Sequence, residues 1–541
     1  MKTQIQLRST ILILALSCFF QMVKAQAPSL QWQRCIGGSE DDENPYIVRG
    51  MLRLADGNLL TYGATASADG DFKKNKGGYD GCLVKMDQEG NILWTKTYGG
   101  SGDEIIFDVL ETNKGGLIVA ASTTSNDGDV SGNHGGYDIW MFRTNKAGKI
   151  QSQHCFGGSG DDDIPVLHKT NNGNLIISCG SNSNDGDVSG NHGDYDGWVF
   201  SIKQSNGVVQ WSHCIGGSDY DDLSIGAFES NGYLFFGGES FSDDGDVTGF
   251  HGGTTDDGDL LVAKIALDGN LISAKCYGGS AGESPHELAK MADGNMVCTG
   301  FSSSHDGDLT GGANPDGNTF AIKINVVTDE VMWHYMSTFT DITAGFAVIP
   351  TADGGCVIPG AIAPDFAWET WDCWMVKLDV NGDTVWSKIV GGSNGDTFCD
   401  GIENPDGSLV IQATTSSNDG DVSGNHGGIA DFWVVKFSND EERISFAQES
   451  AVSDFKCYPN PLNTSTSVSF ALPSSQNISL QIFDVNGRLI RTLASEVMSE
   501  GMHTLTWNAR DENGSELSEA IYFLRMQTEN EVRTIQISVA R

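Results

Sequence analysis

The sequence predicts an all-β chain that consists of a seven-bladed β-propeller of four-stranded blades and a small C-terminal Ig-like β-sandwich. Two motifs recur with a period of about 60 residues, and the two ends of the repeat region are complementary. Gly-Gly pairs begin at Gly37, Gly99, Gly157, Gly216, Gly278 and Gly391. Asp-Gly-Asp triplets begin at Asp69, Asp127, Asp185, Asp244, Asp306 and Asp419. The doubled interval before the last member of each series indicates a sixth copy that has lost both motifs.

Each copy is expected to form a four-stranded meander. In the second copy, runs rich in β-branched and apolar residues are separated by turns that contain Gly115 and Gly148. The four expected strands cover residues 104–112, 116–122, 137–144 and 149–156. No helical period of comparable length is present, so a parallel α/β sheet is not expected.

The ends of the repeat region predict that the ring closes on itself. The region begins with a fourth-strand segment at residues 31–36, and its last copy stops after a third-strand segment at residues 431–437. The N-terminal strand is therefore expected to complete the last blade. A linear β-solenoid would have no reason to begin and end at such complementary points.

Two further segments flank the repeats. Lys2 and Arg8 precede an apolar run and then Val23-Lys24-Ala25, which is the order found in a cleaved signal peptide. The expected division is a signal peptide over residues 1–25, the propeller over 26–437, a linker over 438–454 and the sandwich over 455–541. No later segment has the apolar length of a transmembrane helix, so none is predicted.

The chain is strongly acidic, with a formal net charge of -40 at pH 7. Such a surface repels phosphate backbones, which argues against nucleic acid as a partner. Successive connections in a meander alternate between the two ends of the sheet, so the Gly-Gly loops and the Asp-Gly-Asp loops are expected on one acidic face. The acids expected there from the Gly-Gly loops are Asp41, Asp42, Asp103, Asp161, Asp162, Asp221 and Asp396.

The Asp-Gly-Asp loops resemble twelve-residue calcium loops. In the second copy, oxygen-bearing side chains stand at loop positions 1, 3, 5 and 12, with a glycine at position 6. The predicted Ca²⁺ ligands are Asp127, Asp129, Ser131 and Asp138, then Asp185, Asp187, Ser189 and Asp196, and finally Asp419, Asp421 and Ser423. In the alternative interpretation, these side chains only cap turns through local hydrogen bonds.

Histidines occupy one equivalent loop position in four copies. They are His134, His192, His251 and His426. Zinc needs three or four converging ligands, which residues on four separate blades do not provide. We therefore expect these histidines to be turn residues.

Catalytic residues are not singled out by the sequence. The acids recur in nearly every copy, and no Gly-x-Ser-x-Gly elbow, phosphate loop or zinc spacing is present. A calcium-dependent carbohydrate-active enzyme is one alternative function, and it would need residues that are unique to one blade. The degenerate sixth copy offers Asp365, Trp368, Glu369, Trp371 and Asp372.

Residues 30–437 resemble the bacterial SBBP-type β-propeller repeat. The resemblance rests on the run from Val84 to Trp94 and on the run from Thr97 to Asp103. It implies a fold and no particular activity, because one fold hosts many functions.

Residues 455–541 resemble the C-terminal sorting domain of the Bacteroidetes type IX secretion system, also called the Por secretion type A domain. The resemblance rests on Tyr458-Pro459-Asn460-Pro461, the run from Asp484 to Arg488, Gly501, Trp507, Gly514 and Ile521-Tyr522-Phe523. It implies recognition by the type IX translocon and passage through the periplasm to the outer-membrane surface or the medium. Ala520 stands where the family usually has glycine, and the chain ends without a lysine pair. The alternative is an Ig-like domain that only stabilises or tethers.

The leading hypothesis is a secreted or cell-surface propeller that does not catalyse a reaction. It would bind a glycan or a protein on its acidic loop face, with loops stabilised by calcium. The alternatives are the carbohydrate-active enzyme and a purely structural protein of the surface or matrix.

Overall fold

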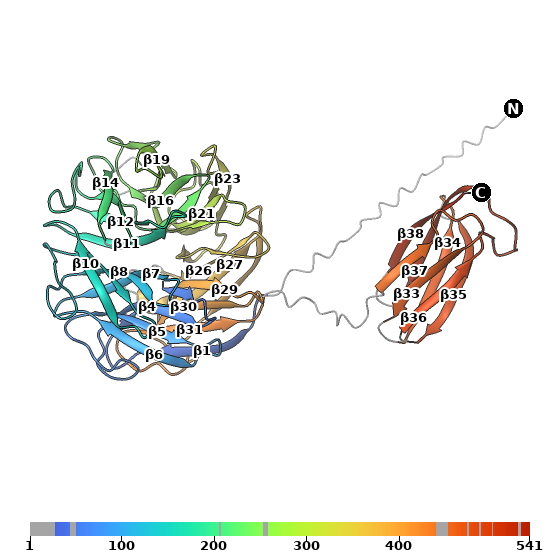
Figure 1. The fold of residues 1–541 in the computed structure, drawn as a ribbon, viewed down its shortest axis with the longest axis horizontal. Coiled ribbons are helices and arrows are strands. Elements are labelled where there is room, and N and C mark those ends of the chain that lie inside the picture. Colours follow the sequence, from blue (N-terminus) through green and yellow to red (C-terminus); the bar gives the residue numbers. More distant parts are fainter. Residues whose placement is uncertain are drawn as a thin grey trace, which may run out of the picture. The chain divides into compact units, whose positions relative to one another are not determined.

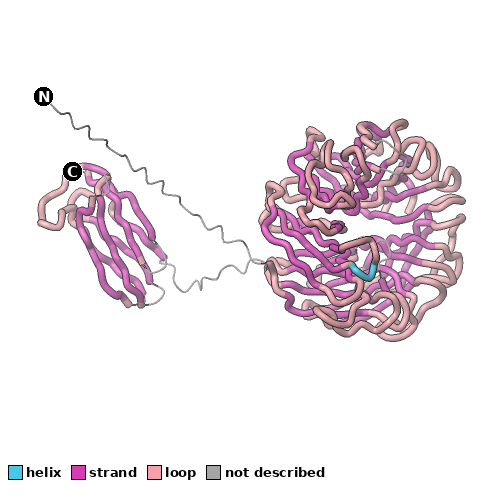
Figure 2. The backbone as a smooth tube through the Cα atoms, turned by 180° about the vertical axis from the view of Figure 1, so that it is seen from behind, coloured by secondary structure: helices cyan, strands magenta, loops and turns pink. Residues whose placement is uncertain are grey.

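The computed structural model describes residues 27–43, 50–204, 207–252, 258–439, 453–472, 475–485, 488–499, 501–528 and 532–540. The predicted signal peptide lies outside these ranges, as does most of the predicted linker. The chain divides into two compact units, Met1–Glu441 and Glu442–Arg541 (Figure 1). Regular structure in the described residues is β, apart from the short 3-10 segment η1 at Trp368–Thr370 (Figure 2).

The first unit contains seven sheets, each built around four strands. The first sheet has β2 (Asp42–Glu43), β3 (Met51–Arg53), β4 (Leu59–Thr65), β5 (Asp80–Met86) and β6 (Ile92–Tyr98). The second has β7 (Glu104–Glu111), β8 (Leu117–Thr123), β9 (Asp138–Thr144) and β10 (Ile150–Phe156). The third has β11 (Asp162–Lys169), β12 (Leu175–Ser181), β13 (Asp196–Ile202) and β14 (Val209–Ile215).

The fourth sheet has β15 (Gly226–Ser230), β16 (Tyr233–Ser240), β17 (Val247–Thr248), β18 (Asp259–Ala266) and β19 (Leu271–Tyr277). The fifth has β20 (Glu283–Lys290), β21 (Met296–Ser302), β22 (Asn318–Ile324) and β23 (Val331–Met336). The sixth has β24 (Ile342–Gly345), β25 (Ile349–Pro350), β26 (Cys356–Ala363), β27 (Asp372–Leu378) and β28 (Thr384–Val390). The seventh has β29 (Asp396–Glu403), β30 (Leu409–Thr415), β31 (Asp431–Phe437) and the N-terminal β1 (Leu30–Ile36).

The N-terminal strand joins the last copy of the repeat. β1 pairs antiparallel with β31, with Arg34 opposite Val434. Each sheet contacts the sheet that follows it in the chain, and β29 of the seventh sheet contacts β3 of the first. In Figure 1 the sheets follow one another around the unit in chain order, and β1 lies beside β31.

Apolar side chains between neighbouring sheets form the core of this unit. β8 is buried along its whole length, whereas the outer strand β10 is mostly exposed or half-buried. One cluster joins Leu83 of the first sheet to Val119 and Trp140 of the second. Burial of this apolar area, at about 25 cal/mol per Å², holds adjacent sheets together.

The second unit contains two sheets. Their orders are β32–β33–β36 and β35–β34–β37–β38. The strands are β32 (Ser453–Tyr458), β33 (Thr466–Leu472), β34 (Gln476–Phe483), β35 (Leu489–Met498), β36 (Gly501–Trp507), β37 (Ala520–Gln527) and β38 (Val532–Val539). Both sheets contribute to one core, which includes Phe470, Leu480 and Trp507. This arrangement is a small Ig-like β-sandwich.

Candidate functional site

The acids that follow the Gly-Gly pairs are mostly buried anchors. Asp162 is fully buried, and its Oδ2 accepts hydrogen bonds from the Gly158 N–H at 2.8 Å and the Ser183 hydroxyl at 2.9 Å. The Ser181 hydroxyl donates to Oδ1. The second glycine donates in the same way to Asp42, Glu104, Asp221, Glu283 and Asp396. These six carboxylates, named here the clamp acids, tie each Gly-Gly connection to the sheet that follows it.

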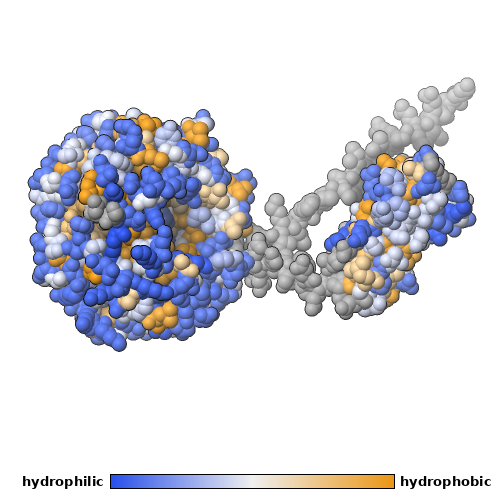
Figure 3. Space-filling model, in the orientation of Figure 1, coloured by the Kyte–Doolittle hydropathy of each residue, from blue (hydrophilic) through white to orange (hydrophobic). Residues whose placement is uncertain are grey.

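Burial raises the pKa of five of the clamp acids, namely Asp42, Asp162, Asp221, Glu283 and Asp396. It raises the pKa of Asp42 and Asp221 to about 6 and that of Glu283 to about 7, although each carboxylate receives hydrogen bonds that act in the opposite direction. The expectation that all acids of these loops form an exposed acidic face is therefore wrong for Asp42, Asp162, Asp221 and Asp396, which are buried. Exposed hydrophilic residues nonetheless cover much of the face that Figure 3 shows.

Several of the predicted calcium ligands form hydrogen bonds or ion pairs with residues of other loops and strands. At the first loop position, Asp127 Oδ1 accepts the Ser101 N–H at 2.7 Å, and Asp185 and Asp419 make the equivalent bonds at 2.6 and 2.7 Å. At the third position, Asp129 pairs with Lys76. The hydroxyls of Ser131 and Ser423 accept hydrogen bonds from glutamine side chains. Asp187, Ser189 and Asp421 lie exposed on their loops.

At the last loop position, Asp138 and Asp196 are fully buried. Oδ2 of Asp138 accepts the His134 N–H at 3.0 Å, and Oδ2 of Asp196 accepts the His192 N–H at 2.9 Å. The Oδ1 atoms of both aspartates are buried without a hydrogen-bond partner in the described part of the chain. Across that same part, no group of three or more His, Cys, Asp or Glu side chains is arranged to hold a metal ion. Calcium binding by these loops therefore stays a prediction.

The four loop histidines are turn residues, as expected. The Nδ1 atoms of His134, His192, His251 and His426 lie 2.7, 2.6, 2.9 and 2.8 Å from a carboxylate oxygen at the start of the third strand of their own sheet. Each imidazole ring therefore contacts a carboxylate of its own sheet.

The sixth copy does not bring the residues suggested by the sequence into one group. Asp365 Oδ1 accepts hydrogen bonds from the Ala367 N–H at 3.0 Å and the Thr370 hydroxyl at 2.8 Å, so it caps its own turn. Glu369 is exposed, and Trp371 packs against an apolar cluster that contains Phe346. The side chain of Trp368 lies outside the described set. Asp372, at the start of β27, lies beside Gly391.

A cavity of about 380 Å³ lies instead where the third and fourth sheets meet. We name this cavity the fourth-copy pocket. Its lining residues are Asp194, Asp219, Tyr220, Glu239 and Phe241. Three of them differ from the residues of the third copy at the same positions. Tyr220 stands where the third copy has Asp161, Glu239 where it has Gly180, and Phe241 where it has Asn182. Sequence analysis missed these residues, although alignment of the copies would have found them.

Aromatic rings form one side of this pocket. The ring centroids of Tyr195 and Tyr220 lie 5.3 Å apart, and those of Tyr220 and Phe241 lie 5.9 Å apart in an edge-to-face contact. Asp222 lies beneath them and is 8% exposed. Its Oδ1 accepts the Glu239 N–H at 2.9 Å, and the Tyr220 hydroxyl lies 3.3 Å from its Oδ2. Asp222 thereby fixes the rings against β16.

Several carboxyl groups lie close together in and beside the fourth-copy pocket. Burial raises the pKa of Glu239 to about 8, and the negative charge of Asp222 adds to this effect. Burial also raises the pKa of Asp163 to about 7, with Asp161 and Asp222 contributing. The Asp222 charge is the main cause of a raised pKa for Tyr220. Near neutral pH, the side chain of Glu239 therefore holds its proton.

Such a site has the chemistry of a sugar-binding pocket. Aromatic rings offer apolar faces to the C–H groups of a pyranose ring. Ionised carboxylates accept hydrogen bonds from hydroxyls, and a protonated carboxyl group can donate one. A few convergent polar groups beside apolar surface are typical of small-molecule sites.

Comparisons with known proteins add information on the second unit. Residues 461–531 match the FlgD Ig-like domain family. No curated protein matches the chain.

Solved structures resemble the chain only distantly. PorZ, a surface component of the type-IX secretion system of Porphyromonas gingivalis, has 13% identity and a TM-score of 0.39; the match covers 93% of this chain and 60% of that chain. A fungal alcohol oxidase has 10% identity and a TM-score of 0.46, over 95% and 100% of the two chains. The polysaccharide lyase Uly1 has 9% identity and a TM-score of 0.40, over 77% and 95%. Likenesses this weak carry no argument about function.

Proposed function

We propose that this chain is a surface-displayed or secreted β-propeller that binds a glycan in the fourth-copy pocket without catalysing a reaction. The observation that carries the proposal is the break in the repeat. At one place in the repeat region, Tyr220, Glu239 and Phe241 replace the residues of a neighbouring copy and together line a cavity.

The seven sheets are inferred to close into a seven-bladed propeller. Two contacts support this inference. β1 completes the seventh sheet by pairing with β31, and β29 of that sheet contacts β3 of the first. Radial arrangement of four-stranded sheets leaves only short, protected edges.

Export by the type IX system is the second part of the proposal. It rests on the signal-peptide pattern before Gln26 and on the sorting-domain motifs between Tyr458 and Phe523. The Ig-like sandwich of the second unit is compatible with a sorting domain. Among the described residues, no helix has the length and hydropathy to cross a membrane.

The third part of the proposal is that the Asp-Gly-Asp loops of the second and third copies bind calcium. The buried Oδ1 atoms of Asp138 and Asp196 have no hydrogen-bond partner among the described residues, so each retains an unused acceptor. Calcium takes six to eight oxygen ligands, so backbone carbonyls and water would have to complete such a site.

The glycan proposal is tested by restoring the repeat. The triple variant Tyr220→Asp, Glu239→Gly, Phe241→Asn gives the fourth copy the residues that the third copy carries at the same positions. A glycan array identifies the ligand of the wild type, and titration calorimetry then measures both proteins. We expect at least a tenfold loss of affinity, because the stacking rings and the carboxyl group are removed together.

A matched control makes the same kind of change in the second copy. Ser122→Gly with Thr124→Asn also introduces third-copy residues, away from the fourth-copy pocket, and should leave affinity unchanged. Equal binding by the triple variant and the wild type would contradict the choice of site. Release of shortened sugar from the bound glycan would contradict the non-catalytic assignment.

A further inference from the structure

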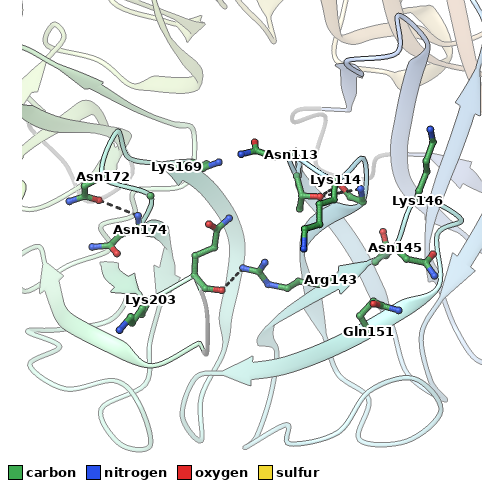
Figure 4. A pocket seen from close by; sticks show the side chains of 15 residues that line it. Asn113, Lys114, Arg143, Asn145, Lys146, Gln151, Lys169, Asn172, Asn174 and Lys203 are labelled. Atoms are coloured by element: carbon green, nitrogen blue, oxygen red, sulfur yellow. Dashed lines mark hydrogen bonds between the residues drawn. The ribbon is translucent and has the colours of Figure 1, made fainter.

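A second cavity, of about 770 Å³, lies between the second and third sheets at their hairpin turns (Figure 4). Its lining includes five basic residues and no acidic residue, although the chain has a formal net charge of -40. The basic residues are Lys114, Arg143, Lys146, Lys169 and Lys203. We name this site the basic cavity. Hairpin turns and Asp-Gly-Asp loops emerge at opposite ends of a meander, so the basic cavity is separate from the fourth-copy pocket.

The repeat shows that this positive charge is a local departure. In the first, fifth and sixth sheets, a lysine of the third strand pairs with an aspartate of the first hairpin turn. The pairs are Lys85–Asp56 at 2.6 Å, Lys323–Asp293 at 2.7 Å and Lys377–Asp353 at 2.9 Å. In the second copy, Arg143 takes the place of the strand lysine, and Lys114 takes the place of the turn aspartate. The acidic partner has been replaced by another cation.

The turn between the third and fourth strands of the second copy has also lost an acid, and its geometry does not require that loss. In the first copy, Asp87 Oδ1 accepts the N–H groups of Glu89 and Asn91 at 3.1 and 2.8 Å. In the second copy, Asn145 Oδ1 accepts the equivalent N–H groups at 2.9 and 3.1 Å. The turn keeps its hydrogen bonds and loses its negative charge.

The third copy shows the same substitution in its first hairpin turn. Asn172 Oδ1 accepts the Asn174 N–H at 3.1 Å, as Asp56 Oδ1 accepts the Asn58 N–H at 3.1 Å in the first copy. Lys203 stands where the first copy has Asp87. At these turn positions, the second and third copies therefore carry amides or cations in place of acids.

The cations of the cavity remain available to a ligand. Within the described ranges, Lys114, Lys169 and Lys203 form no ion pair, and neither does Lys146. Arg143 donates to a backbone carbonyl, that of Gln204, at 2.8 Å. Figure 4 shows Lys169 extending toward Asn113 across the space between the two hairpins.

We propose that the basic cavity binds an acidic polysaccharide, in which hydroxyls alternate with carboxylate or sulfate groups. Five cations require several anionic groups, and a cavity of about 770 Å³ is much larger than a single inorganic anion. Six amide side chains share the lining and suit sugar hydroxyls as donors and acceptors. No aromatic residue lines the cavity, so nucleic-acid bases would find no stacking partner.

The test uses the purified full chain and defined polymers. Titration calorimetry at low salt compares oligogalacturonate, which carries carboxylates, with dextran sulfate, which carries sulfates. Uncharged dextran and inorganic phosphate are the reference ligands. We expect at least one charged polymer to bind, with affinity that falls as salt is added, and we expect no binding of dextran.

The decisive variant is Lys114→Asp with Asn172→Asp, which restores the aspartate found at these turn positions in other copies. Binding of the charged polymer should fall by at least tenfold, because two negative charges enter the cavity and one positive charge leaves it. The control Lys73→Asp with Lys74→Asp changes two exposed lysines of an Asp-Gly-Asp loop and should bind as the wild type does. The triple variant of the fourth-copy pocket should also retain this binding, which separates failure of this proposal from failure of the glycan proposal.

Three results would overturn the proposal. The first is binding of phosphate when neither charged polymer binds. The second is equal binding of the charged polymer by the wild type and by the double variant Lys114→Asp, Asn172→Asp. The third is a loss of binding in the control variant as large as that in the double variant. Melting temperatures measured beside the titrations show that each variant is folded.

Discussion

Two groups of carboxylates lie at the same end of the sheets, and they differ in their hydrogen-bond donors. The clamp acid Asp162 receives donors from Gly158, Ser181 and Ser183. Glu239 receives no side-chain donor among the described residues, and Asp222 lies close enough to raise its pKa further. The clamp occurs in six copies, whereas the second arrangement occurs in one. Repeated acids with several donors thus stabilise the architecture, whereas Glu239 lacks such donors and has a raised pKa.

Removing a clamp acid is expected to have the largest effect. Asp162→Ala leaves two hydroxyls and one N–H without their acceptor in a buried place, and should lower the free energy of unfolding by about 3 kcal/mol. Thermal denaturation followed by circular dichroism measures the loss. Asp161→Ala is the control, because Asp161 is only half-buried and its carboxylate accepts only the Tyr137 N–H at 2.9 Å and, at 3.4 Å, the Tyr195 hydroxyl among the described residues. Equal melting temperatures for the two variants would show that the clamp does not stabilise the fold.

Calcium is expected to have a smaller effect on the same loops. If the Asp-Gly-Asp loops bind calcium only in the folded state, free calcium at 100 times Kd stabilises one site by about 2.7 kcal/mol. Titration calorimetry of the chelator-treated protein should show calcium heat, and its melting temperature should rise. Asp129→Asn and Asp187→Asn should weaken binding, because each removes a charged ligand. If calcium produces neither heat nor a shift in melting temperature, the loops are turn caps alone.

The repeat made most of the strand pattern predictable. The second copy was expected to have strands over 104–112, 116–122, 137–144 and 149–156, and β7, β8, β9 and β10 differ from these by at most one residue at each end. Glycine turns separate these strands, and Gly115 and Gly148 have positive φ angles of 74° and 75°. Glycine adopts that conformation without steric cost, so its position identifies the turn.

The environment of the acids could not be predicted in the same way. Asp161 and Asp162 are adjacent and chemically identical, yet one is half-buried and the other fully buried. Burial of Asp162 depends on Ser181 and Ser183, which follow it by about 20 residues and meet it only through strand pairing. Glu239 of the fourth-copy pocket could have been noticed in the sequence, because the aligned positions of the second and third copies hold Ser122 and Gly180. The sixth copy, whose lost motifs were more conspicuous, formed no comparable group.

The last expected effect is confined to the pH dependence of stability and concerns Glu239. Its pKa is raised to about 8 in the folded chain from an ordinary value of 4.5, so the folded state holds a proton that the unfolded state has released between these pH values. The stability contribution is fully present below about 4.5 and is lost as pH rises through about 8. Glu239→Gln removes this ionisation, so its melting temperature should exceed that of the wild type at pH 8 and come close to it near pH 5. Asp162→Asn is the contrasting variant and should be less stable than the wild type at both pH values. A Glu239→Gln variant that is less stable than the wild type at both pH values would place Glu239 with the clamp acids, and the distinction between repeated and irregular acids would fail. Equal melting temperatures at pH 8 would contradict the raised pKa of Glu239.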